Sequence, residues 1–192
     1  MQKLIVASNS ARRQQLMKDA GFKFEVHVLD VDEVLEADIS NETAAEYLAE
    51  KKNKAYRAIF KDEVIITSDT VVVSNGEILG KPKDEQEAFQ MIESMSGGSH
   101  QVISGVCISG PGHKVSFSDV THVQFEELSP EEINYYIENY KPFDKAGSYG
   151  IQEWIGMIGI QSIQGSFYNV MGLPINKVYQ ILCSEFGISP LV

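Results

Sequence analysis

The chain is poor in cysteine and in long apolar runs. Its two cysteines, Cys107 and Cys183, form neither a CxxC pattern nor a metal-ligand spacing, so we expect two buried, reduced thiols. No apolar run approaches the roughly 18–20 residues that a membrane span requires, and no signal-peptide pattern opens the chain. We therefore expect a cytoplasmic protein with no membrane partner.

Basic residues are also scarce. The 192 residues include 16 Lys and Arg against 27 Asp and Glu, for a formal net charge of −11. A protein that follows a nucleic-acid backbone needs a basic stripe, so we expect no nucleic-acid partner. Any phosphate chemistry should take place in a local pocket where a few cations gather. Length and composition fit one domain over residues 1–192.

One strand stands out in what the sequence does contain. The β-branched run Val64–Val73 predicts a fully buried strand, and Asp69 lies in its middle. Aspartate is depleted from strands, and a buried carboxylate is costly unless a cation or hydrogen-bond donors meet it. Asp69 is therefore either held by structural hydrogen-bond donors or used in catalysis. Whether the rest of the chain supplies cations near it distinguishes these two alternatives.

Two arginines occupy an unusual place. A short strand over Lys3–Ala7 is followed by a helix predicted over Ala11–Ala20, with Ser10 as its N-cap. Arg12 and Arg13 then fall in the first turn, where the helix dipole disfavours cations. Free N–H groups and two guanidinium groups would make a phosphate or carboxylate site. Two solvated arginines would also fit, but the strand–serine–helix context favours the anion site.

Two lysines are further candidates. Lys52 lies on the apolar stripe of a helix predicted over Asn41–Phe60, from which it either extends its stem to water or reaches a buried anion. Asn75-Gly76 predicts a tight hairpin turn after the Asp69 strand. A tight return would place Lys81 near the level of Asp69.

The rest of the chain alternates strands and helices. Phe24, Val26 and Val28 alternate with polar residues, which predicts a half-buried strand. The acidic loop that follows, from Asp30 to Asp38, is either solvated or able to offer a carboxylate to a metal. Later elements are predicted as a helix after Asp84, antiparallel strands over His100–Ser109 and Lys114–Phe125, a helix from Pro130, a strand over Ile158–Ile163 and a helix from Pro174. We expect structural or surface roles for His100 and His122.

Short motifs spread along the whole chain point to one family. They are Ser8–Arg13, Ser68–Val72, Gly80–Pro82, Met95–Val102, Asp144–Gln152 and Asn169–Pro174. Together they resemble the Maf family of nucleoside triphosphate pyrophosphatases. The resemblance implies an α/β fold like that of Maf and ITPase proteins. Its elongated central mixed sheet would be flanked by helices, with an active-site cleft between two lobes.

The resemblance also implies a reaction. A nucleoside triphosphate would be hydrolysed to the monophosphate and pyrophosphate with a divalent metal cation, Mg²⁺ or Mn²⁺. The Ala-Gly-Ser-Tyr-Gly-Ile-Gln motif resembles the branch that acts on dTTP and UTP. Such an enzyme would limit incorporation of non-standard nucleotides, with a link to cell-division arrest. The alternatives are a pyrophosphatase for 7-methyl-GTP or other modified purines, and a nucleotide-binding regulator of cell division. A homodimer is also consistent with the family.

Matching positions supply candidate site residues. The resemblance makes Asp69 the catalytic proton acceptor, and the carboxylates of Asp69 and Glu33 could hold the metal through hard oxygen ligands. Further active-site residues would be Glu33, Lys52 and Lys81, and substrate-binding residues Ser8, Arg12, Arg13, Thr70 and Gln152. The sequence departs from many relatives at Asn9 and Ala11, and at Glu153-Trp154 beside the expected base pocket.

Overall fold

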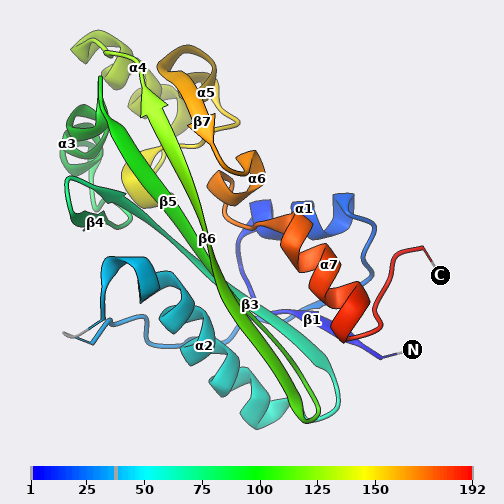
Figure 1. The fold of residues 1–192 in the computed structure, drawn as a ribbon. Coiled ribbons are helices and arrows are strands. Elements are labelled where there is room, and N and C mark those ends of the chain that lie inside the picture. The colour runs from blue at the N-terminus through cyan, green and yellow to red at the C-terminus, as the bar shows by residue number, and fades with distance from the viewer. Residues whose placement is uncertain (1, 37–38, 192) are drawn as a thin grey trace. The chain divides into compact units, whose positions relative to one another are not determined.

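Figure 1 shows the computed structural model of the chain, which describes residues 2–36 and 39–191. Asp38, the last acid of the predicted acidic loop, lies outside the described residues. The chain divides into two compact units. The first unit comprises Met1–Asp69, Ser104–Asp119 and Gly172–Val192, and the second comprises Thr70–Ile103 and Val120–Met171.

The described strands form one mixed sheet in the order β2-β1-β3-β5-β6-β7, with β4 paired to β3. Their bounds are β1 (Leu4–Val6), β2 (Glu25–Val26), β3 (Val64–Ser74), β4 (Glu77–Leu79), β5 (Ser99–Gly110), β6 (His113–Phe125) and β7 (Ile160–Gln164). β1 runs parallel to β2 and β3, whereas the pairs β3–β4 and β6–β7 are antiparallel. The predicted mixed sheet is confirmed.

Helices flank this sheet (Figure 1). They are α1 (Ala11–Asp19), α2 (Asn41–Ile59), α3 (Glu85–Met95), α4 (Pro130–Tyr140), the 3₁₀ helix η1 (Ala146–Ser148), α5 (Trp154–Gly159), α6 (Phe167–Val170) and α7 (Ile175–Glu185). The predicted mixed α/β class with flanking helices is therefore confirmed.

In the first unit, α2 lies directly on the sheet. A Cβ atom on Gly105 of β5 would lie 2.1 Å from the carbonyl carbon of Ala45, so the strand and helix backbones touch there. The buried Thr67 hydroxyl donates to the carbonyl of Ala49 at 2.7 Å, tying the same helix to β3. These contacts fix the helix that carries Lys52.

The second unit has its own core. Side chains from β3, β5 and β6 pack against α3, α4 and α5. The buried members of this cluster are Val72, Ala88, Ile92, Met95, Val102, Val123, Phe125, Leu128, Ile133, Tyr136, Ile137, Tyr149, Ile151 and Ile155. This core supports the glycine-rich segment that contains Gln152.

Capping residues begin the helices where the sequence predicts. The hydroxyl of Ser10 accepts from the Arg13 amide at 3.4 Å, which confirms the predicted cap of α1. Ser129 and Glu132 form a reciprocal capping box at α4, with a proline at the start of the helix. The Asp84 side chain caps α3 by accepting from the Glu87 amide at 2.8 Å.

Two predictions of strands need correction. The predicted half-buried strand around Val26 is only the two-residue β2, and Val26 and Val28 are 40% and 55% exposed. β2 pairs with β1 at the edge of the sheet, so the alternating apolar side chains of this segment have no core to pack against. Phe22, which precedes them, is buried instead. Near the C-terminus, the strand begins at Ile160 rather than Ile158, because the preceding residues form the short helix α5.

Both cysteines are free, as predicted, but Cys183 is only partly buried rather than buried. Cys107 is buried, and burial raises the pKa of its thiol to about 12, which keeps it protonated and unreactive. None of the helices in the described ranges is long and apolar enough to cross a membrane.

Candidate active site

The loop between β1 and α1 is held by its own side chains. The Ser8 hydroxyl accepts from the Ser10 amide at 3.2 Å, and the Gln14 side-chain amide donates to the Ser8 carbonyl at 2.9 Å. Ser8 therefore shapes the turn that enters α1. The structure places Ser8, Arg12 and Arg13 together at this end of the helix, as the sequence predicts.

Arg13 is directed at the main chain. Its Nε donates to the carbonyl of Gly172 at 2.8 Å and one terminal nitrogen donates to the carbonyl of Ser68 at 3.0 Å. Burial lowers the pKa of the Arg13 guanidinium, and the negative charge of Asp69 opposes that change. Arg13 thus holds the strand beside Asp69, a structural task that the sequence did not predict. Its role in binding substrate stays a prediction.

Lys52 lies between two carboxylates. Its Nζ is 2.7 Å from Oε1 of Glu33 and 3.3 Å from Oδ2 of Asp69. The side chains of Lys52 and Asp69 are only 14% and 16% exposed, whereas Glu33 is 52% exposed. The lysine therefore reaches an anion rather than extending its stem to water, which resolves the alternative left open by the sequence. β3, α2 and the acidic loop meet at this ion cluster.

Three further candidates belong to the second unit. Thr70 follows Asp69 on β3 and is partly buried, whereas Lys81 and Gln152 are exposed. The antiparallel pairing matches Leu79 with Val72. Lys81 follows two residues after Leu79, so continuing the register would bring it to the level of Thr70.

The segment that carries Gln152 is tied to the same strand return. The Gly147 amide donates to the carbonyl of Gly80 at 3.0 Å. Gly147 has φ +66°, and a Cβ atom there would lie 3.0 Å from the Val72 side chain. Both features require a glycine. Within the second unit, Lys81 and the glycine-rich segment are therefore linked through adjacent backbone.

Sequence reasoning missed three residues in this region. Tyr136, Lys145 and Glu153 form a polar group next to Gln152, in which Tyr136 and Lys145 are buried and Glu153 is partly buried. Two features of the sequence could have indicated them: the departure at Glu153 from the pattern of many relatives, and a lysine inside a glycine-rich run.

His100 has a structural role, which is one of the two roles predicted for it. Its ring packs edge-on against Phe125 and Tyr149, and its Nε2 lies 2.7 Å from the Tyr149 hydroxyl. Burial lowers the pKa of His100 to about 4, so the ring is neutral at physiological pH. His122 is exposed on β6.

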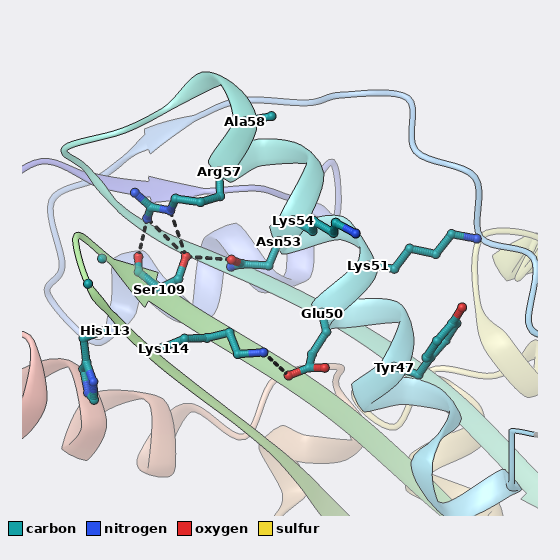
Figure 2. A pocket seen from close by; sticks show the side chains of 12 residues that line it. Tyr47, Glu50, Lys51, Asn53, Lys54, Arg57, Ala58, Ser109, His113 and Lys114 are labelled. Atoms are coloured by element: carbon teal, nitrogen blue, oxygen red, sulfur yellow. Dashed lines mark hydrogen bonds and ion pairs between the residues drawn. The ribbon is translucent and has the colours of Figure 1, made fainter.

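A separate pocket lies on the other side of α2 (Figure 2). It has a volume of about 820 Å³ and is lined by α2 and the β5–β6 turn. Helical periodicity places Lys52 on the opposite face of α2 from these lining residues. In Figure 2, Arg57 and Asn53 converge on Ser109, while Lys114 pairs with Glu50 at 2.6 Å. These groups satisfy one another and hold the helix to the hairpin.

The carboxylates of the ion cluster offer hard oxygen ligands. No group of three or more His, Cys, Asp or Glu side chains suited to a metal ion occurs within residues 2–36 and 39–191. A cation at Asp69 and Glu33 would therefore need further oxygen atoms from water and a bound phosphate. Mg²⁺ is commonly held in this way, by one or two carboxylates with substrate phosphates.

The fold and site together define an α/β protein that gathers two arginines, a lysine and two carboxylates where β1, α1, α2 and β3 meet. A family model described as "Maf-like protein" matches residues 3–185. The chain therefore belongs to the Maf family.

Named relatives are similar over nearly the whole chain. A "dTTP/UTP pyrophosphatase" of Bacteroides thetaiotaomicron is 49% identical over 178 residues, covering 92% of each chain. One of the same name from Phocaeicola vulgatus is 51% identical over 179 residues, covering 92% of this chain and 93% of the relative. Among solved structures, the Ham1 protein of Staphylococcus aureus matches with a TM-score of 0.46 and 17% identity, covering 65% of this chain and 72% of that one.

Proposed function

We propose that this chain hydrolyses dTTP and UTP to the nucleoside monophosphate and pyrophosphate. The observation that carries the proposal is the ion cluster in which Lys52 bridges Glu33 and Asp69. Membership of the Maf family and the names of the relatives support it. We assign the activity to the whole chain, residues 1–192, as one domain.

The first requirement of this reaction is to neutralise the leaving pyrophosphate, since a triphosphate carries about four negative charges. Arg12 at the start of α1 and the Lys52 ammonium supply positive charge in the first unit. Lys81 is a further candidate cation and belongs to the second unit. We assign Arg13 mainly to holding the backbone of β3, because its guanidinium donates to the carbonyls of Ser68 and Gly172.

The second requirement is a water molecule aimed at the α-phosphorus. Asp69 would orient that water and accept its proton, because it is a largely buried carboxylate held beside a lysine. Asp69 and Glu33 would also hold Mg²⁺ or Mn²⁺, and Lys52 must share these carboxylates with the metal. The bound metal would neutralise phosphate oxygens and lower the pKa of a bound water.

The third requirement is choice of base. A glutamine amide offers one donor and one acceptor, which match the O4 and N3–H groups of uracil and thymine. Cytosine presents an amino group at position 4 and no N3–H. We assign this discrimination to Gln152, with Thr70 and Arg12 as further determinants and Ser8 as part of the substrate-binding loop.

The setting of this activity follows from its substrate. Free nucleoside triphosphates belong to the cytoplasm, where we place the protein, with no nucleic-acid or membrane partner. Limiting the pool of unsuitable nucleotides is its proposed purpose. A homodimer is the proposed assembly, which light scattering after size exclusion would test.

A substrate panel tests the proposal. The protein is incubated with each standard triphosphate, 7-methyl-GTP and ITP, with Mg²⁺, with Mn²⁺ and with EDTA, and pyrophosphate and monophosphate are quantified. We expect UTP and dTTP to outcompete CTP and the purines, and EDTA to stop turnover. Preference for GTP, 7-methyl-GTP or ITP would overturn the substrate assignment. Tight binding without turnover would overturn the enzymatic one and favour a nucleotide-binding regulator.

A further inference from the structure

We propose that Glu153 is a positioning residue for base selection, because it fixes the turn that presents the Gln152 amide. The inference rests on the proposed function, which assigns base recognition to Gln152, and extends it to a group that does not touch the substrate. All residues involved belong to the second unit.

The Glu153 side chain folds back into its own turn. The Glu153 amide donates to the carbonyl of Gly150 at 3.0 Å, which closes the turn around Ile151 and Gln152. A Cβ atom on Gly150 would lie 2.8 Å from the carboxyl carbon of Glu153. The carboxylate therefore lies against the bare α-carbon of Gly150, so the turn packs on the side chain of its own last residue, Glu153.

Two partners then fix the carboxylate. The Tyr136 hydroxyl on α4 donates to Oε2 of Glu153, and the Lys145 ammonium lies 3.1 Å from Oε1. The side chains of Lys145 and Glu153 are 8% and 20% exposed, so water weakens this ion pair little. Asp144 also contacts Lys145, at 2.8 Å.

Tyr136 binds both ends of the turn. While its hydroxyl donates to Glu153, its oxygen accepts from the Gly150 amide at 3.0 Å. Burial, followed by the hydrogen bond to Glu153, raises the pKa of Tyr136, so the phenol stays protonated and keeps donating. The first and last residues of the turn are thus held by one atom of α4.

The residues inside the turn differ sharply in exposure. Ile151 is 6% exposed and belongs to the apolar core, whereas Gln152 is exposed. The buried Ile151 precedes Gln152, and Glu153, whose carboxylate is held, follows it. The backbone at Gln152 is therefore fixed, and its side chain projects outward. Selection between uracil and cytosine depends on the direction of that amide, because the two bases interchange donor and acceptor positions.

Steady-state kinetics with UTP and CTP test this role. In Glu153→Ala we expect the ratio of kcat/KM for UTP to that for CTP to fall about tenfold, with KM for UTP rising more than kcat falls. Glu153→Gln keeps an acceptor for Tyr136 and should retain more of the ratio. Tyr136→Phe should lower it in the same direction as Glu153→Ala. Glu138→Gln, an exposed change on α4, is the matched control and should leave the ratio unchanged.

Amide hydrogen exchange supplies a readout that needs no activity. In Glu153→Ala, the amides of residues 150–153 should exchange at least tenfold faster while those of β5 keep their protection. Faster exchange with an unchanged UTP/CTP ratio would overturn the link to base selection, and unchanged exchange would overturn the positioning itself. If the wild-type protein hydrolyses no nucleotide, the proposed function and the base-selection role fail together. The exchange data then still decide whether Glu153 holds the turn. Should Glu153→Ala unfold, Glu153→Gln and Tyr136→Phe carry both readouts.

Discussion

The guanidinium of Arg13 donates a hydrogen bond to the carbonyl of Ser68 at 3.0 Å, and Ser68 immediately precedes Asp69. The same guanidinium holds the carbonyl of Gly172. A side chain from the first turn of α1 thereby fixes the strand at the proposed catalytic carboxylate. A fork of N–H donors in one plane serves two carbonyls at once, which a lysine ammonium cannot reproduce in the same geometry.

Arg13→Lys should therefore lower stability as well as turnover. Losing one of the two hydrogen bonds leaves a carbonyl without its donor, at a cost of about 1–3 kcal/mol in the free energy of unfolding. Urea denaturation measures this loss. Lys18→Ala, an exposed change on the same helix, should stay within about 0.5 kcal/mol of wild type. Equal stabilities for Arg13→Lys and Lys18→Ala would contradict the structural role of Arg13.

Asp69→Asn should keep the fold and lose pyrophosphate release. The amide is nearly isosteric with the carboxylate but cannot accept a proton from water, so we expect turnover to fall about 10²-fold or more. Pyrophosphate release measures the loss, and circular dichroism checks the fold. Asp62→Asn, an exposed change shortly before β3, provides the control. Near wild-type turnover in Asp69→Asn would remove the carboxylate from the mechanism.

Lys52→Ala should reduce turnover much more than Lys51→Ala. Removing the Lys52 ammonium leaves Glu33 and Asp69 without the cation that joins them, and it removes one charge proposed to face the triphosphate. Lys51 pairs with the exposed Asp32 at 3.4 Å, a contact of little energetic value. The measurement is kcat/KM with UTP for both variants. Similar values would show that the cluster is structural only.

The stability of the protein should depend on pH through His100. Burial lowers its pKa in the folded state from 6.5 to about 4. As the pH falls, His100 of the unfolded chain therefore binds a proton near pH 6.5, whereas His100 of the folded chain binds one only near pH 4. The effect of this pKa difference on the free energy of unfolding is nearly constant above pH 7. Between pH 7 and pH 5, proton binding to the unfolded chain lowers the free energy of unfolding by about 2 kcal/mol. Urea denaturation across this range measures it.

His100→Gln should lower the free energy of unfolding at every pH, but that free energy should depend less on pH between pH 7 and pH 5. His122→Gln, an exposed change, should retain the steep dependence. If His100→Gln keeps the wild-type slope between pH 7 and pH 5, the buried ring is not its source.

Local patterns predicted most of the fold because they act over a few residues. The β-branched run around Asp69 and the capping residues Ser10 and Ser129 are signals of this kind, and all three are found where expected. α5 was missed because its sequence, Trp-Ile-Gly-Met-Ile-Gly, contains two glycines and favours a helix weakly. The strand at Val26 was mispredicted because alternation shows which side chains share a face but not whether a core lies opposite.

The candidate site could be predicted only in part, for a similar reason. Composition and local position indicated that Arg13 and Lys52 were unusual. Their partners, however, lie far along the chain: Arg13 contacts residues 55 and 159 positions away. Neither periodicity nor spacing reports such distances, so the sequence could not separate a guanidinium that binds the backbone from one that binds a ligand. The tie between Glu153 and Tyr136 was missed for the same reason.

At Gly105, no side chain separates the backbone of β5 from the backbone of α2. A helix that rests on side chains can roll or slide by repacking them, whereas one in backbone contact has no room to do either. Lys52 is therefore carried by a helix whose backbone is held against β5 at this point. Under the proposed function, adjustment to different bases would come from the residues around Gln152, so we expect variation among homologues in preferred base to accumulate there and not on α2.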